Sequence, residues 1–332
     1  MSFERVLSSC FDGLLDECRS VVDKSVNSCT CDCILLSGGL DTSIVAHLAS
    51  KANPSCYTVV FPYGKSPDLF YAKLVAEKLG LKWRMVELSP ATLDHRLTSV
   101  ISILNTFDPM EVRNSVAVYQ GLLEAVWDGF SRVMTGDGAD ELFAGYSFIF
   151  NLEPNQMMLR LRQLWSVMHF SSKPMAESLK MNALLPYLDK NVVEFAKKLE
   201  PQHFVGQRIG RKYGKFILRV AFENLIGKRL AWRKKTPIEH GSGTTALSKY
   251  YSEKIGDNQF LEEKIKILRN DRVEIRDKEH LYYYKLFRNL CPPPAETSST
   301  PYRCPSCWAD APKGSTFCVV CGAYPISVVE VD

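Results

Sequence analysis

Apolar residues along the first half of the chain follow two spacings in turn. Residues 3–24 carry them at helical spacing, which predicts a first helix. Short apolar runs predict buried strands in CDCILL (31–36), YTVVFP (57–62), KWRMVEL (82–88) and SRVM (131–134). Helices are predicted between these strands, over 42–51, 66–80 and 116–129. Ser66 is the predicted N-cap of the helix over 66–80.

This alternation predicts an α/β fold with a doubly wound parallel sheet. From about residue 150 to 290 the pattern becomes helical, and CPPPAETSSTP (291–301) has the composition of a linker. The predicted parts are an N-terminal helical segment (1–30), a main domain (31–290), a linker (291–302) and a small cysteine-bearing unit (303–325). Ligands of such sheets bind beyond the carboxyl ends of the strands, where two glycine-rich turns fall.

Composition narrows the class of protein. The 46% apolar and 23% charged residues are ordinary for a soluble globular protein, and no apolar run approaches the roughly 18 residues of a membrane span. The first residues show no export signal, so we expect a cytoplasmic protein without membrane contact. Eleven cysteines then indicate reduced thiols or metal ligands, not a disulfide framework.

Positive charge is concentrated between Gly206 and Lys235. Ten Lys or Arg residues face one acidic residue, Glu223, within this segment, although the net charge of the whole chain is only +4. Such a run is either a solvated helical face or an electropositive wall for polyphosphate or RNA.

The turn SGGLDTS (37–43) joins the first predicted strand to the following helix. Backbone N–H groups of a glycine-rich turn form an anion site, and Gly38 and Gly39 permit close approach of the anion. Three hydroxyl donors are available, on Ser37, Thr42 and Ser43. Asp41 would repel phosphate unless a cation lay between them, so it implies Mg²⁺. A plain capped turn would not explain this aspartate, and the lysine of the GxxxxGKS/T loop is absent.

The second turn, TGDGADELFAGY (135–146), places three acids at the start of a helix. Carboxylates at this position suit the helix dipole, but three acids beside two glycines exceed what a cap needs. Asp140 is a candidate to share Mg²⁺ with Asp41, and Asp137 is a candidate general base for an amine nucleophile.

SGGLDTS resembles the pyrophosphate loop of the N-type ATP pyrophosphatases, which cleave ATP between its α- and β-phosphates. Over residues 13–290 the chain resembles the synthetase domain of the glutamine-dependent asparagine synthetases and the related β-lactam synthetases. The similarity runs in order through SGGLDTS, SPDLFYAKLVAEKLG, VRNS (112–115), TGDGADELFAGY, LLPYLDKNVVEFA (184–196), GKFILRVAF (214–222), AWRKKTPIEHGSG (231–243) and KEHLYYYKLF (278–287).

The resemblance implies a role for each matching residue. It implies that ATP lies over the first turn, and the nucleotide-binding set is Ser37, Gly38, Gly39, Leu40, Asp41, Thr42, Ser43, Val60, Thr135 and Gly136. It implies that Asp41 and Asp140 hold Mg²⁺–pyrophosphate and that Asp137 lies near the amine. Lys235 would stabilise the charge that develops during adenylation, with Lys215 as a second basic group near the phosphates. The basic run would then face the triphosphate.

Three departures from the family pattern stand out. The family's glutaminase domain has its nucleophilic cysteine after the initiator Met, but this chain has Ser2 and about thirty residues before the first loop, so we expect no glutamine hydrolysis by it. Asp137 stands where Glu is common. Asn182, Ala183 and Leu184 replace the usual E-x-R segment, which bears on the amino-acid pocket.

The tail contains two CxxC pairs separated by ten residues. Cys304, Cys307, Cys318 and Cys321 have the spacing of a structural zinc ribbon, in which four thiolates leave no open position for catalysis. The alternating Cys29, Cys31 and Cys33 are either small strand residues or a metal or thiol site on one strand face.

The leading interpretation is an AMP-forming amide ligase that uses ATP, Mg²⁺ and a structural Zn²⁺. Its substrates would be a small carboxylate, by default aspartate for asparagine biosynthesis, and ammonia or an amine, which a separate glutaminase subunit is one candidate to supply. Two alternatives stay open. One is a tRNA-modifying ATP pyrophosphatase, and the other is an ATP-binding subunit of a larger amidotransferase.

Overall fold

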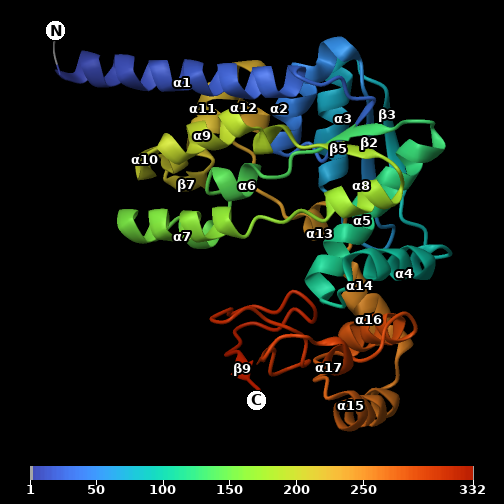
Figure 1. Cartoon of the computed structure of the whole chain (residues 1–332). Helices are drawn as coiled ribbons and strands as arrows, with labels where there is room; N and C mark the ends of the chain where they lie inside the picture. The colour runs from blue at the N-terminus through green and yellow to red at the C-terminus, as the bar shows by residue number, and fades with distance from the viewer. Residues whose placement is uncertain (1–2, 332) are drawn as a thin grey trace. The chain divides into compact units, whose positions relative to one another are not determined.

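The computed structural model describes residues 3–331 (Figure 1). The polypeptide divides into two compact units. The first comprises residues up to Thr58, then Pro67–Val86 and Gly121–Pro237, and the second comprises Val59–Ser66, Glu87–Gln120 and the residues from Ile238 onward.

A five-stranded sheet in the order β3-β2-β1-β4-β5 organises the fold. Its strands are β1 (Cys33–Leu35), β2 (Ser55–Val60), β3 (Trp83–Glu87), β4 (Arg132–Met134) and β5 (Asn182–Leu184). β1 pairs in parallel with β2 and β4, and β4 pairs in parallel with β5. The chain builds outward from β1 to β3 and then returns to the other side of β1, so the predicted doubly wound sheet is confirmed. Its switch point lies between β1 and β4.

Helices of the first unit bury their apolar faces around this sheet. They are α1 (Phe3–Asn27), α2 (Leu40–Ala49), α3 (Asp68–Leu79), α6 (Ala139–Leu142), α7 (Pro154–Ser166), α8 (Ser172–Ser178), α9 (Lys190–Lys198), α10 (Pro201–Phe204), α11 (Phe216–Ile226) and α12 (Lys228–Ala231). Three short 3-10 turns lie at Ser50–Ala52, Ser147–Ile149 and Pro186–Leu188. α1 packs along α9 and α11 (Figure 1) and buries Cys18 and Val22 in the core that also holds Ile34 of β1.

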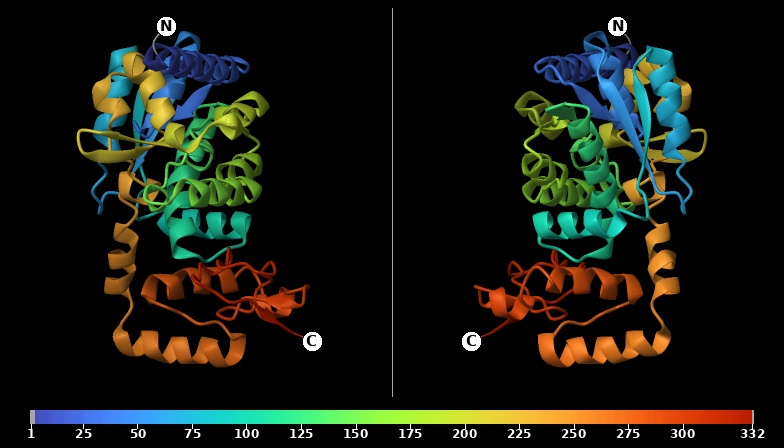
Figure 2. Two further views of the ribbon diagram at one scale, coloured as in Figure 1. Left: turned by 90° about the vertical axis from the view of Figure 1, so that its left-hand side faces the viewer. Right: turned by 90° about the vertical axis from the view of Figure 1, so that its right-hand side faces the viewer.

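The second unit is mainly helical. It contains α4 (Leu93–Leu104), α13 (Ile238–Gly241), α14 (Ala246–Lys254), α15 (Asp257–Asp271), α16 (Lys278–Arg288) and α17 (Pro294–Thr297), and the division between the units falls within α5 (Pro109–Trp127). Figure 2 shows α15 and α16 in orange and the tail in red. Tyr284 and Phe287 of α16 pack on the buried ring of Phe107. The tail holds a two-stranded ladder of β8 (Tyr302–Arg303) and β9 (Val329–Glu330).

Several local predictions need correction. Helix α3 begins at Asp68 with Pro67 as its N-cap residue, so Ser66 is not the cap, and its hydroxyl instead donates to the carbonyl of Ser242 at 2.7 Å. The segment after residue 150 is not purely helical, because it contributes β5 and the antiparallel hairpin of β6 (Val205–Arg208) and β7 (Arg211–Gly214). None of the helices within residues 3–331 has the length and apolar character needed to cross a membrane.

Candidate active site

The two glycine-rich turns follow β1 and β4, the strands on either side of the switch point. They touch at Gly136, where an added Cβ would lie 3.0 Å from the Cβ of Asp41 and 3.1 Å from Cγ2 of Thr42. The structure therefore brings the predicted nucleotide-binding residues of both turns together at the carboxyl edge of the sheet.

Gly38 fixes the shape of the first turn. Its φ is +64°, and an added Cβ would lie 2.3 Å from the backbone N of Ala72, so only glycine fits between the turn and α3. Within the turn, the hydroxyls of Ser37 and Thr42 lie 3.0 Å apart, and the buried hydroxyl of Ser43 has no hydrogen-bond partner.

Arg233 holds this turn from the outside, and sequence reasoning had counted it only as part of the basic run. Its guanidinium donates to the carbonyls of Gly38 at 2.9 Å and Ser37 at 3.3 Å, pairs with Asp68 at 2.5 Å and lies over the ring of Tyr71. Arg233 therefore satisfies the backbone carbonyls of Ser37 and Gly38 and stabilises the conformation of the turn.

Two lysines and two carboxylates form the centre of the site. The Nζ atom of Lys215 lies 2.5 Å from Oδ2 of Asp41 and 2.8 Å from Oδ1 of Asp140. The Nζ atom of Lys235 lies 2.9 Å from the same Oδ1 of Asp140 and 4.0 Å from the centre of the Tyr146 ring. The four groups, each from a different motif, therefore share one cluster.

Unusual backbone geometry brings Lys215 into this cluster. Lys215 has φ +54° at the N-cap of α11, and its amide donates to the carbonyl of Phe143 at 2.8 Å. Ala144 also has φ +54°. An added Cβ on Gly145 would lie 1.8 Å from Oδ1 of Asp140 and 2.4 Å from Cε of Lys215, so this glycine is required for the close approach of the two side chains.

The environment separates the pKa values of the carboxylates. Burial raises the pKa of Asp41, although Lys215 opposes the rise. Burial also opposes ionisation of Asp140, but Lys215 and Lys235 together outweigh it and lower its pKa to about 2. The two carboxylates in turn raise the pKa of Lys215 against the effect of burial, so its ammonium is held in the charged form.

The donor set fits a hard divalent cation. Oδ1 of Asp41 is buried and has no hydrogen-bond partner, and Mg²⁺ prefers carboxylate oxygens. Asp41 and Asp140 are bridged by Lys215, so a cation that engaged both would meet two oxygen donors already held close together.

Asp137 lies in the second turn and accepts a hydrogen bond from the Ser172 hydroxyl at the start of α8. Burial raises the pKa of Asp137, and the hydrogen bond from Ser172 partly offsets that rise. The backbone amide of Asp137 donates to the hydroxyl oxygen of Thr135 at 3.4 Å. A carboxylate with a raised pKa suits the predicted role of general base.

Only part of the basic run lies at the two turns. Arg219 is buried and donates to backbone carbonyls of Gly214 and Ala231, while Arg208 pairs with Glu223. Lys234 is exposed. The run is therefore a mixture of site residues and internal stabilising residues, and not a continuous wall. Val60 ends β2 as a buried residue of the second unit, and its assignment to the nucleotide remains a prediction.

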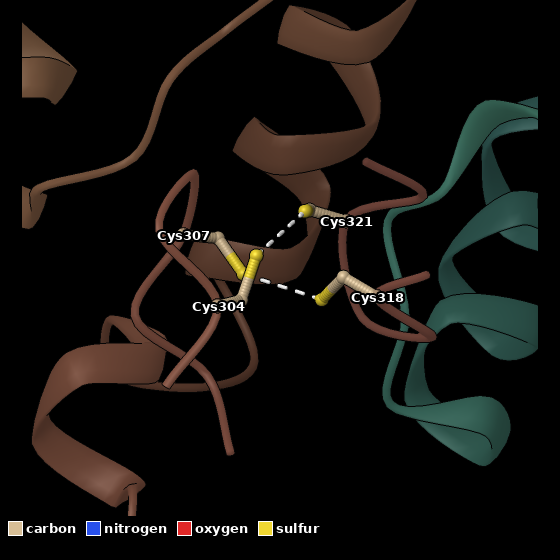
Figure 3. Close-up of side chains that lie close together, drawn as sticks. All are labelled: Cys304, Cys307, Cys318 and Cys321. Carbon is tan, nitrogen blue, oxygen red and sulfur yellow. Dashed lines mark hydrogen bonds between the residues drawn. The ribbon is translucent and has the colours of Figure 1, made fainter. Parts of the chain in front are cut away.

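The tail cysteines converge on one point, as Figure 3 shows. Sγ of Cys304 lies 3.8 Å from Sγ of Cys321, and Sγ of Cys307 lies 3.7 Å from Sγ of Cys318. All four sulfur atoms lie within 4.8 Å of one another and are buried. This cluster is the only group of three or more potential metal ligands found within the described part of the chain.

The alternating cysteines do not share one strand face. β1 begins only at Cys33, Cys29 is exposed before it, and Cys31 and Cys33 are buried. Burial raises the pKa values of the Cys31 and Cys33 thiols, as is typical of structural core cysteines.

A doubly wound sheet with two glycine turns at its switch point defines an α/β protein built to bind a ligand at that edge. A family profile described as asparagine synthase matches residues 17–179 and 153–300. The chain therefore belongs to the asparagine synthase family.

Individual relatives agree with this assignment. The chain is 26% identical over 292 residues to asparagine synthetase B (glutamine-hydrolyzing) of Escherichia coli K12, covering 81% of this chain and 51% of that protein. It is also 26% identical over 293 residues to asparagine synthetase 2 (glutamine-hydrolyzing) of Oryza sativa subsp. japonica, covering 81% and 49%. The chain thus spans about half the length of the relatives it matches.

Solved structures give weaker similarity. An NMN synthetase from Francisella tularensis has a TM-score of 0.28 at 16% identity, with 55% of this chain and 90% of that chain covered. An NH3-dependent NAD synthetase from Campylobacter jejuni has a TM-score of 0.27 at 17% identity, with 68% and 97% covered.

Proposed function

We propose that this protein is an ATP-dependent, AMP-forming amide ligase. The observation that carries the proposal is the cluster of Asp41, Asp140, Lys215 and Lys235 at the switch point of the sheet, in a chain of the asparagine synthase family. In the first step a carboxylate oxygen attacks the α-phosphorus of ATP, which forms an acyl-adenylate and releases pyrophosphate. In the second step an amine nitrogen attacks the acyl carbon, which forms the amide and releases AMP and a proton.

Each residue of the cluster has a role that follows from its charge and position. The phosphates are assigned to the first turn, which Arg233 holds and in which the buried hydroxyl of Ser43 has no hydrogen-bond partner. Asp41 and Asp140 would hold Mg²⁺, which supplies charge neutralisation on the pyrophosphate when bound. The ammonium groups of Lys215 and Lys235 offset the negative charge that grows as the carboxylate reaches phosphorus.

Asp137 is proposed to accept the proton that the amine loses. Its raised pKa makes the carboxylate a better base than an exposed aspartate, and the hydrogen bond from Ser172 fixes its orientation. The side chain is one methylene shorter than the Glu common in the family, so the amine would have to approach the second turn more closely.

The default substrates are aspartate and ammonia, by analogy with the named relatives. Those relatives are described as glutamine-hydrolyzing, so a separate glutaminase subunit is a candidate source of ammonia for this chain. β5 carries Asn182, Ala183 and Leu184 instead of a charged E-x-R segment, so a test of the substrate has to include carboxylates besides free aspartate. A second proposed site, in the tail, is a structural Zn²⁺ bound by the four cysteines.

Product analysis tests the reaction. Purified protein is incubated with ATP, Mg²⁺, a panel of carboxylates, and ammonia, and the nucleotide products are separated. AMP and pyrophosphate are expected, and a heavy-oxygen label in the carboxylate should appear in AMP. ADP as the main product would refute the proposal. Pyrophosphate release that requires bulk tRNA, and no small carboxylate, would favour the RNA-modifying alternative.

A further inference from the structure

The sulfur atoms of the tail already have the spacing of a metal tetrahedron. Four ligands with metal–sulfur bonds of about 2.3 Å occupy corners about 3.8 Å apart. The Sγ–Sγ distances are 3.8 Å for Cys304 and Cys321 and 3.7 Å for Cys307 and Cys318, far longer than a disulfide bond. Their thiols are buried in a segment too short to form a core of its own, where a metal would stabilise the fold.

The second cysteine pair also binds the loop that precedes α5. The hydroxyl of Thr106 donates to the carbonyls of Val319 at 2.8 Å and Val320 at 3.0 Å, and the amide of Phe107 donates to Val320 at 2.8 Å. Gly322 has φ +73°, and an added Cβ would lie 2.0 Å from Oδ1 of Asp108. The turn Val319–Gly322, called the second knuckle below, is therefore packed against Thr106–Asp108 through hydrogen bonds to its carbonyls and the close approach of Gly322 to Asp108.

A second set of hydrogen bonds continues from α5 to residues 238–245. Oδ1 of Asn114 accepts from the amide of Glu239 at 3.0 Å, and the hydroxyl of Thr244 donates to the carbonyl of Arg113 at 2.9 Å. Asp108 connects the two sets, because it lies at the start of α5 and its Oδ1 accepts from the amide of Met110 at 3.1 Å. The second knuckle thus contacts the residues that lead into α5, and residues 238–245 contact Arg113 and Asn114 in the second turn of that helix.

Residues 238–245 are in turn packed against the segment that follows β2. An added Cβ on Gly64 would lie 2.0 Å from the carbonyl oxygen of Gly243, and the amide of Phe61 donates to Ser242 at 2.8 Å. Thr244 and Ser242 are buried. Residues 238–243 are the end of the AWRKKTPIEHGSG motif, one of the segments that carry the family resemblance.

We propose that a zinc-class ion in the four-cysteine site orders residues 238–245 through the second knuckle and the start of α5. The metal holds the two cysteine pairs together, and the second knuckle then holds Thr106–Asp108 in place. This positions Arg113 and Asn114 of α5 to form their hydrogen bonds with residues 238–245. The inference does not depend on the ligase proposal, because its readouts are metal content and backbone protection.

Hydrogen exchange of the full-length protein tests this chain of contacts. Zinc is measured by elemental analysis, and exchange is followed in peptides covering 104–116 and 238–246. Cys318→Ser should lower the zinc content and speed exchange in both peptides. Each hydrogen bond that opens should accelerate local exchange by about fivefold. A purified protein without stoichiometric metal, or with iron in its place, would overturn the metal assignment.

Two glycine variants separate the docking of the knuckle from metal binding. Gly322→Ala should keep zinc but accelerate exchange in both peptides, because its Cβ would collide with Asp108. Gly314→Ala is the matched control, since Gly314 has φ +79° but nothing within 4 Å of an added Cβ. Thr106→Val removes the hydroxyl that donates to the second knuckle and accepts from the amide of Asp108, without touching the cysteines, and should act as Gly322→Ala does. Unchanged exchange over 238–246 in both Gly322→Ala and Thr106→Val would refute the coupling.

Discussion

Lys215 is the side chain on which the charge balance of the site depends. Its Nζ atom lies 2.5 Å from Asp41 and 2.8 Å from Asp140, and its side chain is only 4% exposed. Lys215→Met keeps the length of the side chain and removes the ammonium. Asp140 would then keep only Lys235, and Asp41 would lose its hydrogen-bonded partner.

The size of the effect follows from the pKa values and from the behaviour of buried pairs. The pKa of Asp140 falls from the usual 3.8 to about 2, which corresponds to about 2 kcal/mol of stabilisation. Breaking a buried ion pair by removing one partner typically costs about 3–5 kcal/mol. Part of this is offset because the pKa of Asp41 is raised by burial even with Lys215 present. We therefore expect Lys215→Met to lower the free energy of unfolding by about 3 kcal/mol at pH 7.

The loss should depend on pH in a defined direction. In the unmodified protein the folded pKa of Asp140 lies below its unfolded value, so its ionised form stabilises the fold above about pH 4 and this contribution disappears as the pH falls towards 2. In the variant the folded pKa values of both carboxylates rise, and they take up protons at higher pH. The difference between the two proteins should therefore be largest near pH 7 and shrink towards pH 4.

Urea denaturation without nucleotide or magnesium, at several pH values from 7 to 4, measures this difference. Lys234→Met is the matched control, because Lys234 is exposed in the same basic run and should change stability little. A loss that is the same at every pH, or equal to that of the control, would show that Lys215 does not balance these carboxylates.

Three further predictions concern turnover. Lys235→Ala should lower kcat and kcat/KM together by about 10²–10³, because its ammonium offsets charge that develops in the transition state. The control Lys234→Ala should have little effect, and a change in the KM for ATP alone would contradict the prediction. Asp140→Asn should abolish turnover at saturating Mg²⁺ while circular dichroism stays unchanged, and near-normal rates would show that Asp140 is not a metal ligand. Ser172→Ala should shift the acidic limb of the pH–rate profile to higher pH, because the lost hydrogen bond lowered the pKa of Asp137, and an unmoved limb would remove Asp137 as the base.

The first half of the fold could be predicted because its strands and helices alternate with strong periodicity. Strand β5 could not be predicted, because Asn182–Leu184 is a three-residue strand whose position is set by pairing with β4 and not by its own composition. The β6–β7 hairpin was also missed. Its turn places Ile209 at φ +48° beside Gly210 at φ +71°, and isoleucine rarely signals such a turn.

The site was predictable where a motif carried the chemistry and not where distant residues converge. Asp41, Asp140 and Lys235 each belong to a motif, and in the structure Lys215 links the two carboxylates while Lys235 pairs with Asp140. The sequence indicates Arg233 only as one residue of the basic run. Its contact with the carbonyl of Gly38 could not be predicted, because the two residues are 195 positions apart in the chain. Tyr146 is the last residue of the TGDGADELFAGY motif, but its position beside the Lys235 ammonium depends on the fold.

The backbone around Lys215 shows that the cluster is ordered by the chain itself. Lys215 and Ala144 both adopt left-handed conformations, each of which costs about 1–2 kcal/mol for a residue with a Cβ. The ion pairs of Lys215 with Asp41 and Asp140 offset this strain, and Gly145 leaves the room that they need. The ammonium thus holds both carboxylates in place before a ligand arrives, so little reorganisation is required when charge develops during the reaction.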